Sequence, residues 1–383
     1  MDKLRVVMIA DSMKMDGIST VIINYCTHLN LEKFKVTIMA GAPVAEANKR
    51  KCAEDGIQIV ELPERKKSYI KFCKVLNRKL REGKYDICHV HGNSATKVTE
   101  LMFAWRNHIC TRVMHCHTTR CQHIWIHRIL SPIFKKAYNR ALACSIQAGE
   151  WIFGKNKFVV LPNAFEVGRF AFNPSKRKSY RKELDMEDAF VLGFVGRLND
   201  QKNYWYALKC FEKYLCENPR ARLLIVGDGA GRDGLIEYVN SSSYKNKITV
   251  YGESDDVSGL LSAMDVFLFP SCYEGLGIAA VEAQISGIPC IISDAVPREV
   301  RISEQIDFLP IGEENISLWV DKIRKIEGLP VNREVSCREN RRASSGYDIK
   351  EAVKFLEHFY TRSVAEEHRR KKGHAGTNPK YTE

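Results

Sequence analysis

The chain has 383 residues, of which 45% are hydrophobic and 27% are charged, and this composition is typical of a globular protein. None of its apolar runs reaches the roughly 18–20 residues that a membrane-spanning helix requires, so we expect no transmembrane segment. The formal net charge of +13 favours an anionic partner, which could be nucleic acid, a membrane surface or a phosphorylated substrate.

The chain opens with the stretch MDKLRVVMIADSMKMDG, whose short apolar run ends at Asp11 without a small-residue cleavage site. This layout predicts a first β-strand rather than a secretion signal. A glycine loop at Gly17 and a helix over residues 19–30 follow. We therefore expect a cytoplasmic protein whose 13 cysteines are free thiols.

Further along the chain, apolar runs of four to eight residues alternate with amphipathic segments. The first series of runs is LRVVMIA, KVTIMAG, IQIVELP, DICHVHG, TRVMHCH, LACSIQA and KFVVLPN, and the second is FVLGFVG, ARLLIVGDG, ITVYG, DVFLFPS and IPCIIS. Such runs are typical of parallel strands that are buried on both faces. The pattern predicts an α/β fold of two Rossmann-like doubly wound domains that face a central cleft.

The boundary between these domains is set by the polar, basic stretch NPSKRKSYRKELDMED, after which the pattern restarts near residue 190. We predict one domain over residues 1–172, a linker over 173–189 and a second domain over 190–347. A helix over about 348–365 is expected to pack back on the first domain. The basic segment 366–383 is expected to be a disordered tail.

A strongly basic segment lies between residues 64 and 84, where nine Lys or Arg residues face two Glu residues, a net charge of +7. It could dock an anionic membrane surface. It could equally be the solvated face of a helix.

A cluster of histidine and cysteine residues occupies residues 114–127. Its members are His115, Cys116, His117, Cys121, His123 and His127. His123 and His127 could share one face of a helix, as zinc ligands often do, but the cluster has no C-x₂-C pair. We favour a single histidine at the mouth of the cleft over a metal site.

The second domain begins with GFVGRLNDQKN, in which Arg197 and Lys202 lie between the end of a strand and the start of a helix. Two cations beside a helix N-terminus suit a phosphate or diphosphate. The alternative is a pair of exposed loop cations.

The stretch SCYEGLGIAAVEAQ contains Glu274 and Glu282, eight positions apart, with Gly275 and Gly277 after the first. The glycines let backbone N–H groups approach an anion, while carboxylates accept hydrogen bonds from hydroxyl groups. Together these groups fit a sugar attached to a nucleotide diphosphate. The alternative is a capped helix with one buried, paired glutamate.

Taken together, these motifs resemble the family-4 retaining glycosyltransferases of the GT-B fold, in particular bacterial enzymes of capsular or exopolysaccharide synthesis. The resemblance rests on GRLNDQKN, LLIVGDG, DDVSGLLSAMDVFLFPS and EGLGIAAVEAQISGIPCIISD, and it is strongest over residues 190–300. The E-x₇-E spacing of Glu274 and Glu282 matches the signature of the family.

The resemblance implies a role for each matching residue of the second domain, which would bind the nucleotide sugar. Arg197 and Lys202 would neutralise the donor diphosphate, Glu274 would contact hydroxyls of the donor sugar, and Glu282 would bind the ribose. The amides of Gly275, Leu276 and Gly277 would meet the distal phosphate or the sugar.

In the first domain, which would bind the acceptor, Gly17 would allow closure over the phosphates and His117 would line the reaction centre. His115 could match that histidine position equally well. The loop DGIST lacks the Gly-Gly pair that relatives often have, so the donor contact of Gly17 is less well supported. No cofactor and no metal ion are implied.

The implied enzyme is a hexosyl- or N-acetylhexosaminyltransferase that uses a UDP-sugar. Its acceptor would be a saccharide or a polyprenyl-linked saccharide, and it would act in cell-surface polysaccharide synthesis at the inner face of the plasma membrane. Three alternatives remain: a nucleotide-sugar epimerase on the same fold, a nucleic-acid-binding protein, and a metal-dependent hydrolase built on the His/Cys cluster.

Overall fold

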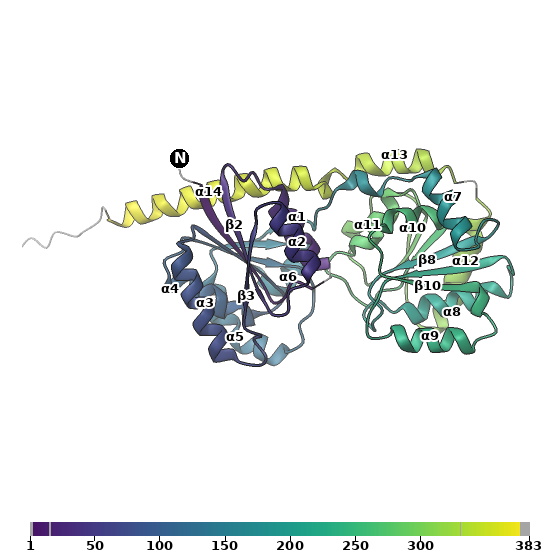
Figure 1. Cartoon of the computed structure of the whole chain (residues 1–383), viewed down its shortest axis with the longest axis horizontal. Coiled ribbons are helices and arrows are strands. Elements are labelled where there is room, and N and C mark those ends of the chain that lie inside the picture. Colours follow the sequence, from purple (N-terminus) through teal and green to yellow (C-terminus); the bar gives the residue numbers. More distant parts are fainter. Residues whose placement is uncertain (1–2, 15–16, 330, 376–383) are drawn as a thin grey trace, which may run out of the picture. The chain divides into compact units, whose positions relative to one another are not determined.

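The computed structural model describes residues 3–14, 17–329 and 331–375, with side chains as far as residue 370. The chain forms two compact units (Figure 1). The first unit consists of Met1–Phe165 and Tyr347–Glu383, and the second consists of Glu166–Gly346.

The first unit is built on a seven-stranded sheet with the order β3-β2-β1-β4-β5-β6-β7, in which every pair is parallel. The strands are β1 (Leu4–Ala10), β2 (Phe34–Gly41), β3 (Gln58–Leu62), β4 (Ile87–Gly92), β5 (Thr111–Cys116), β6 (Arg140–Ala143) and β7 (Val159–Val160). The helices are α1 (Gly17–His28), α2 (Glu46–Glu54), α3 (Tyr69–Gly83), α4 (Val98–Arg106), α5 (Ile124–Ala137), α6 (Ile146–Phe153) and α14 (Ile349–Ala375). The strand order reverses between β1 and β4, which is where doubly wound sheets usually bind ligands.

The second unit contains a six-stranded parallel sheet with the order β10-β9-β8-β11-β12-β13. The strands are β8 (Phe190–Val195), β9 (Ala221–Val226), β10 (Ile248–Gly252), β11 (Val266–Phe269), β12 (Cys290–Ser293) and β13 (Ile306–Leu309). The helices are α7 (Pro174–Glu183), α8 (Tyr204–Leu215), α9 (Arg232–Ser241), α10 (Val257–Ala263), α11 (Ile278–Ile285), α12 (Ile316–Glu327) and α13 (Arg333–Ala343). Short 3₁₀ helices are η1 (Ala95–Lys97) in the first unit, η2 (Val167–Phe170), η3 (Lys245–Lys247), η4 (Arg298–Val300) and η5 (Glu313–Asn315) in the second, and η6 (Ser345–Tyr347) at the boundary.

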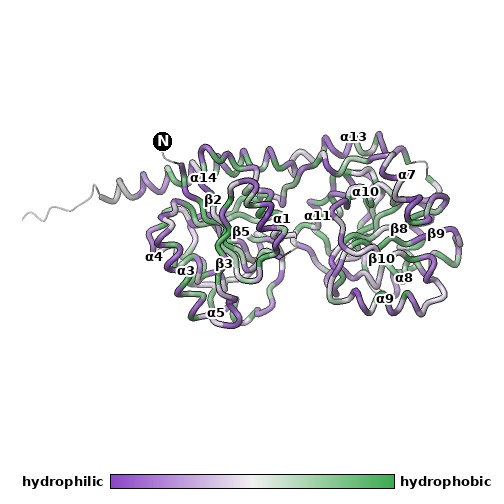
Figure 2. The backbone as a smooth tube through the Cα atoms, viewed as in Figure 1, coloured by the Kyte–Doolittle hydropathy of each residue, from purple (hydrophilic) through white to green (hydrophobic). Residues whose placement is uncertain are grey.

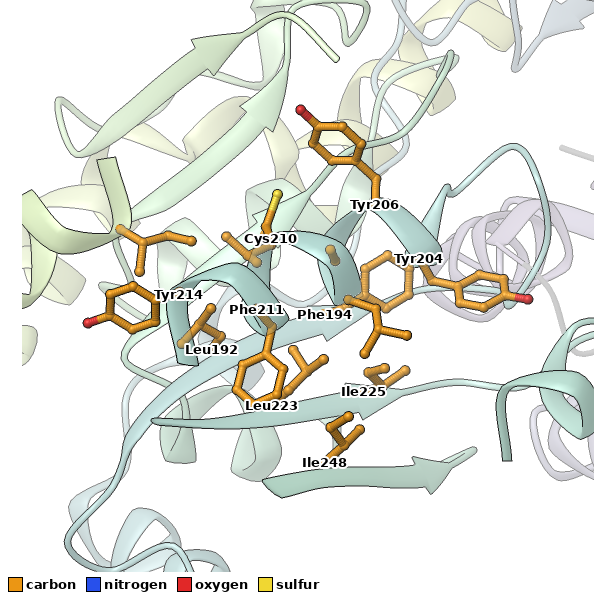
Figure 3. Packing of buried hydrophobic residues seen from close by; sticks show 14 of the residues in the cluster. Leu192, Phe194, Tyr204, Tyr206, Cys210, Phe211, Tyr214, Leu223, Ile225 and Ile248 are labelled. Carbon is orange, nitrogen blue, oxygen red and sulfur yellow. The ribbon is translucent and has the colours of Figure 1, made fainter. Parts of the chain in front are cut away.

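Hydrophobic residues concentrate along the strands of each unit, and hydrophilic residues concentrate along the outer helices (Figure 2). In the second unit, Leu192 and Phe194 of β8 and Leu223 of β9 pack against the aromatic rings of Phe211 and Tyr214 on α8 (Figure 3). Because helices cover both faces of each sheet, most strand residues are buried and apolar, whereas His89 and His91 of β4 and His115 of β5 are buried polar residues. The predicted α/β fold of two Rossmann-like domains is confirmed, and the central cleft stays a prediction.

The predicted linker over 173–189 is wrong, because this segment belongs to the second unit and forms helix α7. Lys178 and Lys182 are exposed, but its two arginines are packed against the rest of the second unit. Arg177 donates to the Asp265 carboxylate at 2.6 Å, and Arg181, which is buried, pairs with the same carboxylate. The N-terminal segment of the first unit ends at Phe165, whereas the sequence predicted that the first domain would end at residue 172.

The C-terminal helix α14 belongs to the first unit, as predicted. The carboxylate of Glu357 accepts a hydrogen bond of 2.8 Å from the backbone N–H of Asn30. The helix does not end near residue 365 but continues to Ala375, because Glu366 and Glu367 hold Arg140 of β6 at 2.9 and 3.0 Å. The predicted disorder of 366–383 is therefore wrong for 366–375, and 376–383 lie outside the described residues.

None of the helices in the described part of the chain combines the length and the apolar character that a bilayer-spanning segment requires.

Candidate functional site

The loop after β8 carries the two predicted cations. The backbone N–H of Gly196 donates to Val226 at 3.0 Å and that of Leu198 donates to Asp228 at 2.9 Å, so the loop is tied to the end of β9. Leu198 is buried and Arg197, beside it, is exposed. The sequence therefore places one guanidinium at the carboxyl end of the sheet on a loop with a fixed backbone.

Lys202, the second cation, contacts the first of the two predicted carboxylates. Its Nζ lies 2.6 Å from Oε1 of Glu274 and 4.9 Å from the centre of the Phe269 ring. The Glu274 side chain is only 7% exposed. Two motifs that lie 72 residues apart in the sequence thus meet at the ends of the adjacent strands β8 and β11.

The backbone reinforces this meeting of the two loops. The N–H of Cys272 donates to the carbonyl of Gln201 at 2.8 Å, and the Gln201 side-chain amide donates to the carbonyl of Tyr273 at 3.1 Å. These contacts between the two loops therefore hold Lys202 and Glu274 close to each other. Glu274 is therefore a buried glutamate with an ion-pair partner, as the alternative interpretation of this motif expected. Its partner is Lys202, the lysine that is predicted to bind phosphate.

Helix α11 begins directly after the glycine pair. Gly277 has φ +99°, a left-handed conformation, and a Cβ there would lie 3.2 Å from Val296 and 3.3 Å from Phe269. Glycine is the residue type that adopts this conformation without strain. Leu276 is buried, at 2% exposure, so its side chain anchors the loop and only its backbone can meet a ligand.

Glu282 lies on α11. Unlike the carboxylate of Glu274, its carboxylate makes no such short contact with a lysine among the described residues. Burial raises the pKa of its carboxyl to about 7, although the positive charges of Arg169 and Lys202 lower it. Arg169 lies on η2, which packs against α11, and it donates to the carbonyl of Asp255. The sequence did not reveal Arg169, because it precedes the second sheet and no motif marks it.

In the first unit, the carboxyl ends of β4 and β5 carry four histidines on one face. His91 lies opposite His115 in the parallel register, and the two-residue period of a strand places His89 and His117 on that same face. All four are buried. His89 and His91 were missed in the sequence, although the spacing HVH in DICHVHG matches that of HCH in TRVMHCH.

These imidazoles form two hydrogen-bonded chains. In the first chain, His91 Nδ1 lies 2.8 Å from His117 Nε2, and His117 Nδ1 lies 2.8 Å from Oδ1 of Asn163. In the second, His89 Nδ1 lies 2.5 Å from the Tyr360 hydroxyl of α14, and His89 Nε2 lies 3.2 Å from His115 Nδ1. We define these four residues as the histidine cluster.

Burial keeps the histidine cluster uncharged. It lowers the pKa of His89 to about 3 and that of His117 to about 4, and it lowers those of His91 and His115 well below the ordinary value. His117 retains 5% exposure and His115 none, so His117 is the better match for a histidine at the reaction centre. That role stays a prediction.

The histidine cluster also bears on metal binding. One ring nitrogen from each of His89, His91 and His115 lies within 4.8 Å of the other two. A tetrahedral zinc ion with bonds of about 2.0–2.1 Å needs about 3.3 Å between ligand nitrogens, and His89 Nε2 and His115 Nδ1 are 3.2 Å apart. The absence of a metal from the reaction stays a prediction.

The predicted pair His123 and His127 does not form a site. His123 is exposed, whereas His127 is buried, accepts from the backbone N–H of Ala95 at 3.1 Å, and stacks on Trp151. The shared helix face expected for a metal is therefore absent at these two residues.

Gly17 is the first residue of α1, and nothing lies within 4 Å of a Cβ placed there. Residues 15–16 before it lie outside the described residues. At the end of β1, Asp11 pairs with Lys97, which is buried and lies 3.4 Å from Glu100. The sequence analysis did not identify this ion-pair group, of which Lys97 and Glu100 are buried and Asp11 is exposed, and the role of Gly17 stays a prediction.

The fold and this arrangement of groups define a GT-B glycosyltransferase. The crystal structure of Anabaena HepE in complex with UDP and glucose superposes with a TM-score of 0.77 at 16% identity, covering 94% of this chain and all of that one. Sucrose-phosphate synthase from Thermosynechococcus elongatus gives a TM-score of 0.72 at 14% identity, covering 95% of this chain and all of that one. These likenesses concern the fold.

Sequence comparison assigns the family. The family described as Glycosyltransferase Family 4 matches residues 15–169, and that described as Glycosyl transferases group 1 matches residues 175–344. EpsF of Bacillus subtilis, named as a glycosyltransferase, is 27% identical over 77% of this chain and 80% of its own length. An Escherichia coli protein named UDP-Gal:alpha-D-GlcNAc-diphosphoundecaprenol alpha-1,3-galactosyltransferase is 26% identical over 74% of this chain and 77% of its own length. The chain belongs to the family-4 glycosyltransferases, and it is an enzyme that transfers sugars.

Proposed function

We propose that the enzyme transfers a hexosyl or N-acetylhexosaminyl group from a UDP-sugar to a lipid-linked saccharide, with retention at the anomeric carbon, in cell-surface polysaccharide synthesis. The observation that carries this proposal is the contact of 2.6 Å between Lys202 and Glu274, beside the glycine start of α11. In the proposed site, Lys202 would bind a phosphate and Glu274 a sugar hydroxyl of the same donor molecule, and their contact supports this because it brings the two groups together. The UDP complex of HepE and the name of the E. coli relative support the choice of donor and acceptor.

In the proposed reaction, the bond between the anomeric carbon and the diphosphate oxygen breaks, and negative charge develops on the leaving diphosphate. Arg197, Lys202 and the amides of Gly275 and Gly277 stabilise that charge. The acceptor hydroxyl attacks the same face of the sugar and gives its proton to the leaving phosphate, so the protein supplies no base. Glu274, already oriented by Lys202, holds hydroxyls of the donor sugar.

The test of this function is release of the nucleoside diphosphate across a panel of UDP-, GDP- and ADP-sugars, with and without polyprenyl-diphosphate saccharides as acceptors. We expect release to require both a UDP-sugar and an acceptor. An epimerised donor, formed without any acceptor, would instead establish the alternative of an epimerase. Neither the nucleic-acid-binding alternative nor the hydrolase alternative has a counterpart among the relatives reported above.

The raised pKa of Glu282 predicts a pH dependence. The native carboxyl titrates near pH 7 and the unfolded one near its ordinary value of 4.5, so the native state holds an extra proton between these values. Stability is therefore greatest below pH 4.5 as far as this group is concerned, and it falls as the pH rises through 7. Glu282→Gln removes the charge, and we expect it to raise the free energy of unfolding at pH 8 by about 1–3 kcal/mol, with little change at pH 5.

The same substitution separates stability from binding. If Glu282 binds the ribose hydroxyls as a carboxylate, the wild-type KM for the donor falls between pH 6 and 8, while that of Glu282→Gln stays high and flat. The two curves are measured by nucleotide release, with unfolding followed by circular dichroism. A donor KM that is unchanged by Glu282→Gln at pH 8 would exclude the ribose contact.

The basic segment 64–84 is proposed to contact an anionic membrane surface. Arg65 is not available for this, because it pairs with Glu100 at 2.9 Å and contacts the Thr96 carbonyl at 2.8 Å. Lys66, Lys71 and Lys74 are exposed and remain candidates. Each well-placed cation would contribute about 1 kcal/mol to binding of an anionic bilayer.

A further inference from the structure

The outer face of helix α5 is unusually apolar. Trp125 is 71% exposed, Ile126 46%, Ile129 74% and Ile133 53%. Single exposed apolar residues are common on proteins, but these four follow one another at the i, i+1, i+4 and i+8 positions of one helix. They form a continuous stripe of more than two turns, which we call the α5 stripe.

The α5 stripe is not the side of the helix that packs against the core of the first unit. The opposite side of α5 already packs inward, through the buried His127, Phe134 and Ala137. The helix is thus apolar on both sides. The inner side stabilises the fold, whereas the outer side has no structural use among the described residues of the first unit.

Positive charge surrounds the α5 stripe. Arg128, Lys135 and Lys136 are exposed on α5 itself, and the Arg128 guanidinium lies 5.4 Å from the centre of the Trp125 ring. Between residues 101 and 149 the chain has seven Lys or Arg residues and no Asp or Glu. Carboxylates that would repel an anionic surface are therefore absent from the whole segment around the helix.

The neighbouring helices extend this surface. Helix α4 packs beside α5 and exposes Trp105 and Met102, and α3 packs beside α4 and carries the exposed Lys71 and Lys74 (Figure 1). Exposed apolar residues and exposed cations thus occur together on these helices, since α3 also exposes Tyr69 and Ile70. Apolar side chains next to a cationic region are the pattern of a helix that lies in a membrane interface.

We propose that the α5 stripe inserts into the headgroup boundary of an anionic phospholipid bilayer. Trp125, Ile126, Ile129 and Ile133 would enter the boundary, and Arg128, Lys135 and Lys136 would contact lipid phosphates. A second copy of the chain is a poorer occupant, because a symmetric contact through this face would bring the same cations together. Membrane binding would bring the enzyme to a lipid-linked acceptor, and this use of the contact rests on the proposed function. The binding of the α5 stripe to a bilayer does not rest on that function.

Sedimentation with vesicles of phosphatidylcholine, with and without 30 mol% phosphatidylglycerol, tests this contact. We expect the wild type to bind the anionic vesicles at least about tenfold more tightly. Trp125→Ser with Ile129→Ser should lower binding to both kinds of vesicle about tenfold or more. Arg128→Gln with Lys135→Gln and Lys136→Gln should lower binding to the anionic vesicles alone.

A matched control comes from the second unit, where Tyr238 and Leu318 are 40% and 44% exposed. Tyr238→Ser with Leu318→Ser removes one aromatic and one aliphatic exposed side chain from the second unit and should leave vesicle binding unchanged. Fluorescence of Trp125 should be quenched by phospholipids with brominated acyl chains, and Trp125→Phe should remove that part of the quenching. The melting temperature of each variant shows whether it is folded.

Equal binding by wild type and by both α5 variants would overturn the proposal. So would light scattering that shows a wild-type dimer converted to a monomer by Trp125→Ser with Ile129→Ser, since the stripe would then be a subunit contact. Transfer to a water-soluble saccharide should be unchanged in the α5 variants. If the α5 variants lose vesicle binding but the wild type turns over no sugar nucleotide, the membrane contact stands and the proposed function fails.

Discussion

Replacing Lys202 or Arg197 with alanine is expected to lower kcat by roughly 10²–10³ for each substitution. Both side chains are proposed to stabilise negative charge that develops on the leaving diphosphate, and removal of one such donor usually has an effect of this size. The loss should appear in kcat, measured by nucleotide release at saturating donor, because the charge is larger in the transition state than in the bound donor.

The two substitutions should differ in their effect on stability. Lys202 holds the Glu274 carboxylate, whose side chain is 7% exposed, and its loss leaves that carboxylate buried without its lysine. We expect Lys202→Ala to lower the free energy of unfolding by about 1–3 kcal/mol. Arg197 is exposed, so Arg197→Ala should leave the melting temperature nearly unchanged.

A double variant separates folding from catalysis. Glu274→Gln in the Lys202→Ala background removes the buried negative charge, so it should raise the melting temperature of that variant but not restore turnover. Lys209→Ala is a matched control, because Lys209 is an exposed lysine of α8 that pairs with Glu313. Full activity of either single variant, or loss of activity with a chelator that added metal restores, would contradict this mechanism.

Acidification should destabilise the first unit through the histidine cluster. The pKa of His89 lies at about 3 and that of His117 at about 4 because of burial, whereas unfolded histidines titrate near 6.5. Above pH 6.5 both states are neutral and the full stability is present. Below it the unfolded state binds protons that the native state excludes, so stability is lost as the pH falls from 6.5 towards 3–4.

The size of this effect follows from proton linkage. Each histidine that is neutral in the native state and charged in the unfolded state costs about 1.4 kcal/mol per pH unit. His89 and His117 alone should therefore remove several kcal/mol of stability between pH 6 and 4. The measurement is urea unfolding at a series of pH values, with a probe in the first unit.

Variants of two histidines isolate the cluster. His91→Asn should reduce the slope of stability against pH by about 1.4 kcal/mol per unit, because the pKa of His91 is also far below its ordinary value. His123→Asn replaces an exposed histidine and should leave the slope unchanged. Equal slopes for wild type and His91→Asn would contradict the assignment of neutral, buried imidazoles.

The elements that could be predicted from the sequence are those with strong local patterns. Buried parallel strands are mostly apolar, and the loop residues Arg197, Lys202, Glu274 and Gly277 follow such strands in the sequence. Because the carboxyl ends of parallel strands share one edge, their meeting could be expected before the structure was known. The distance between Lys202 and Glu274 supports that expectation in detail.

The features that were missed depend on contacts distant in the sequence. The local sequence of helix α7 predicts a linker, because nothing in it shows that Asp265 neutralises Arg177 and Arg181. His89 and His91 look like strand residues until the register of β4 and β5 places them beside His115. Arg169 influences Glu282 only through the packing of η2 on α11.

The attachment of α14 to the first unit has a consequence for the order of folding during synthesis. The Tyr360 hydroxyl that contacts His89, and the Glu357 carboxylate that holds the start of β2 through Asn30, leave the ribosome only after the entire second unit has been made. Domains usually fold from the N-terminus onwards as they emerge, but here the contiguous unit of Glu166–Gly346 is complete first. The nascent first unit must wait without the helix that packs against α1 and β5, and any chain that stops before residue 347 lacks these contacts.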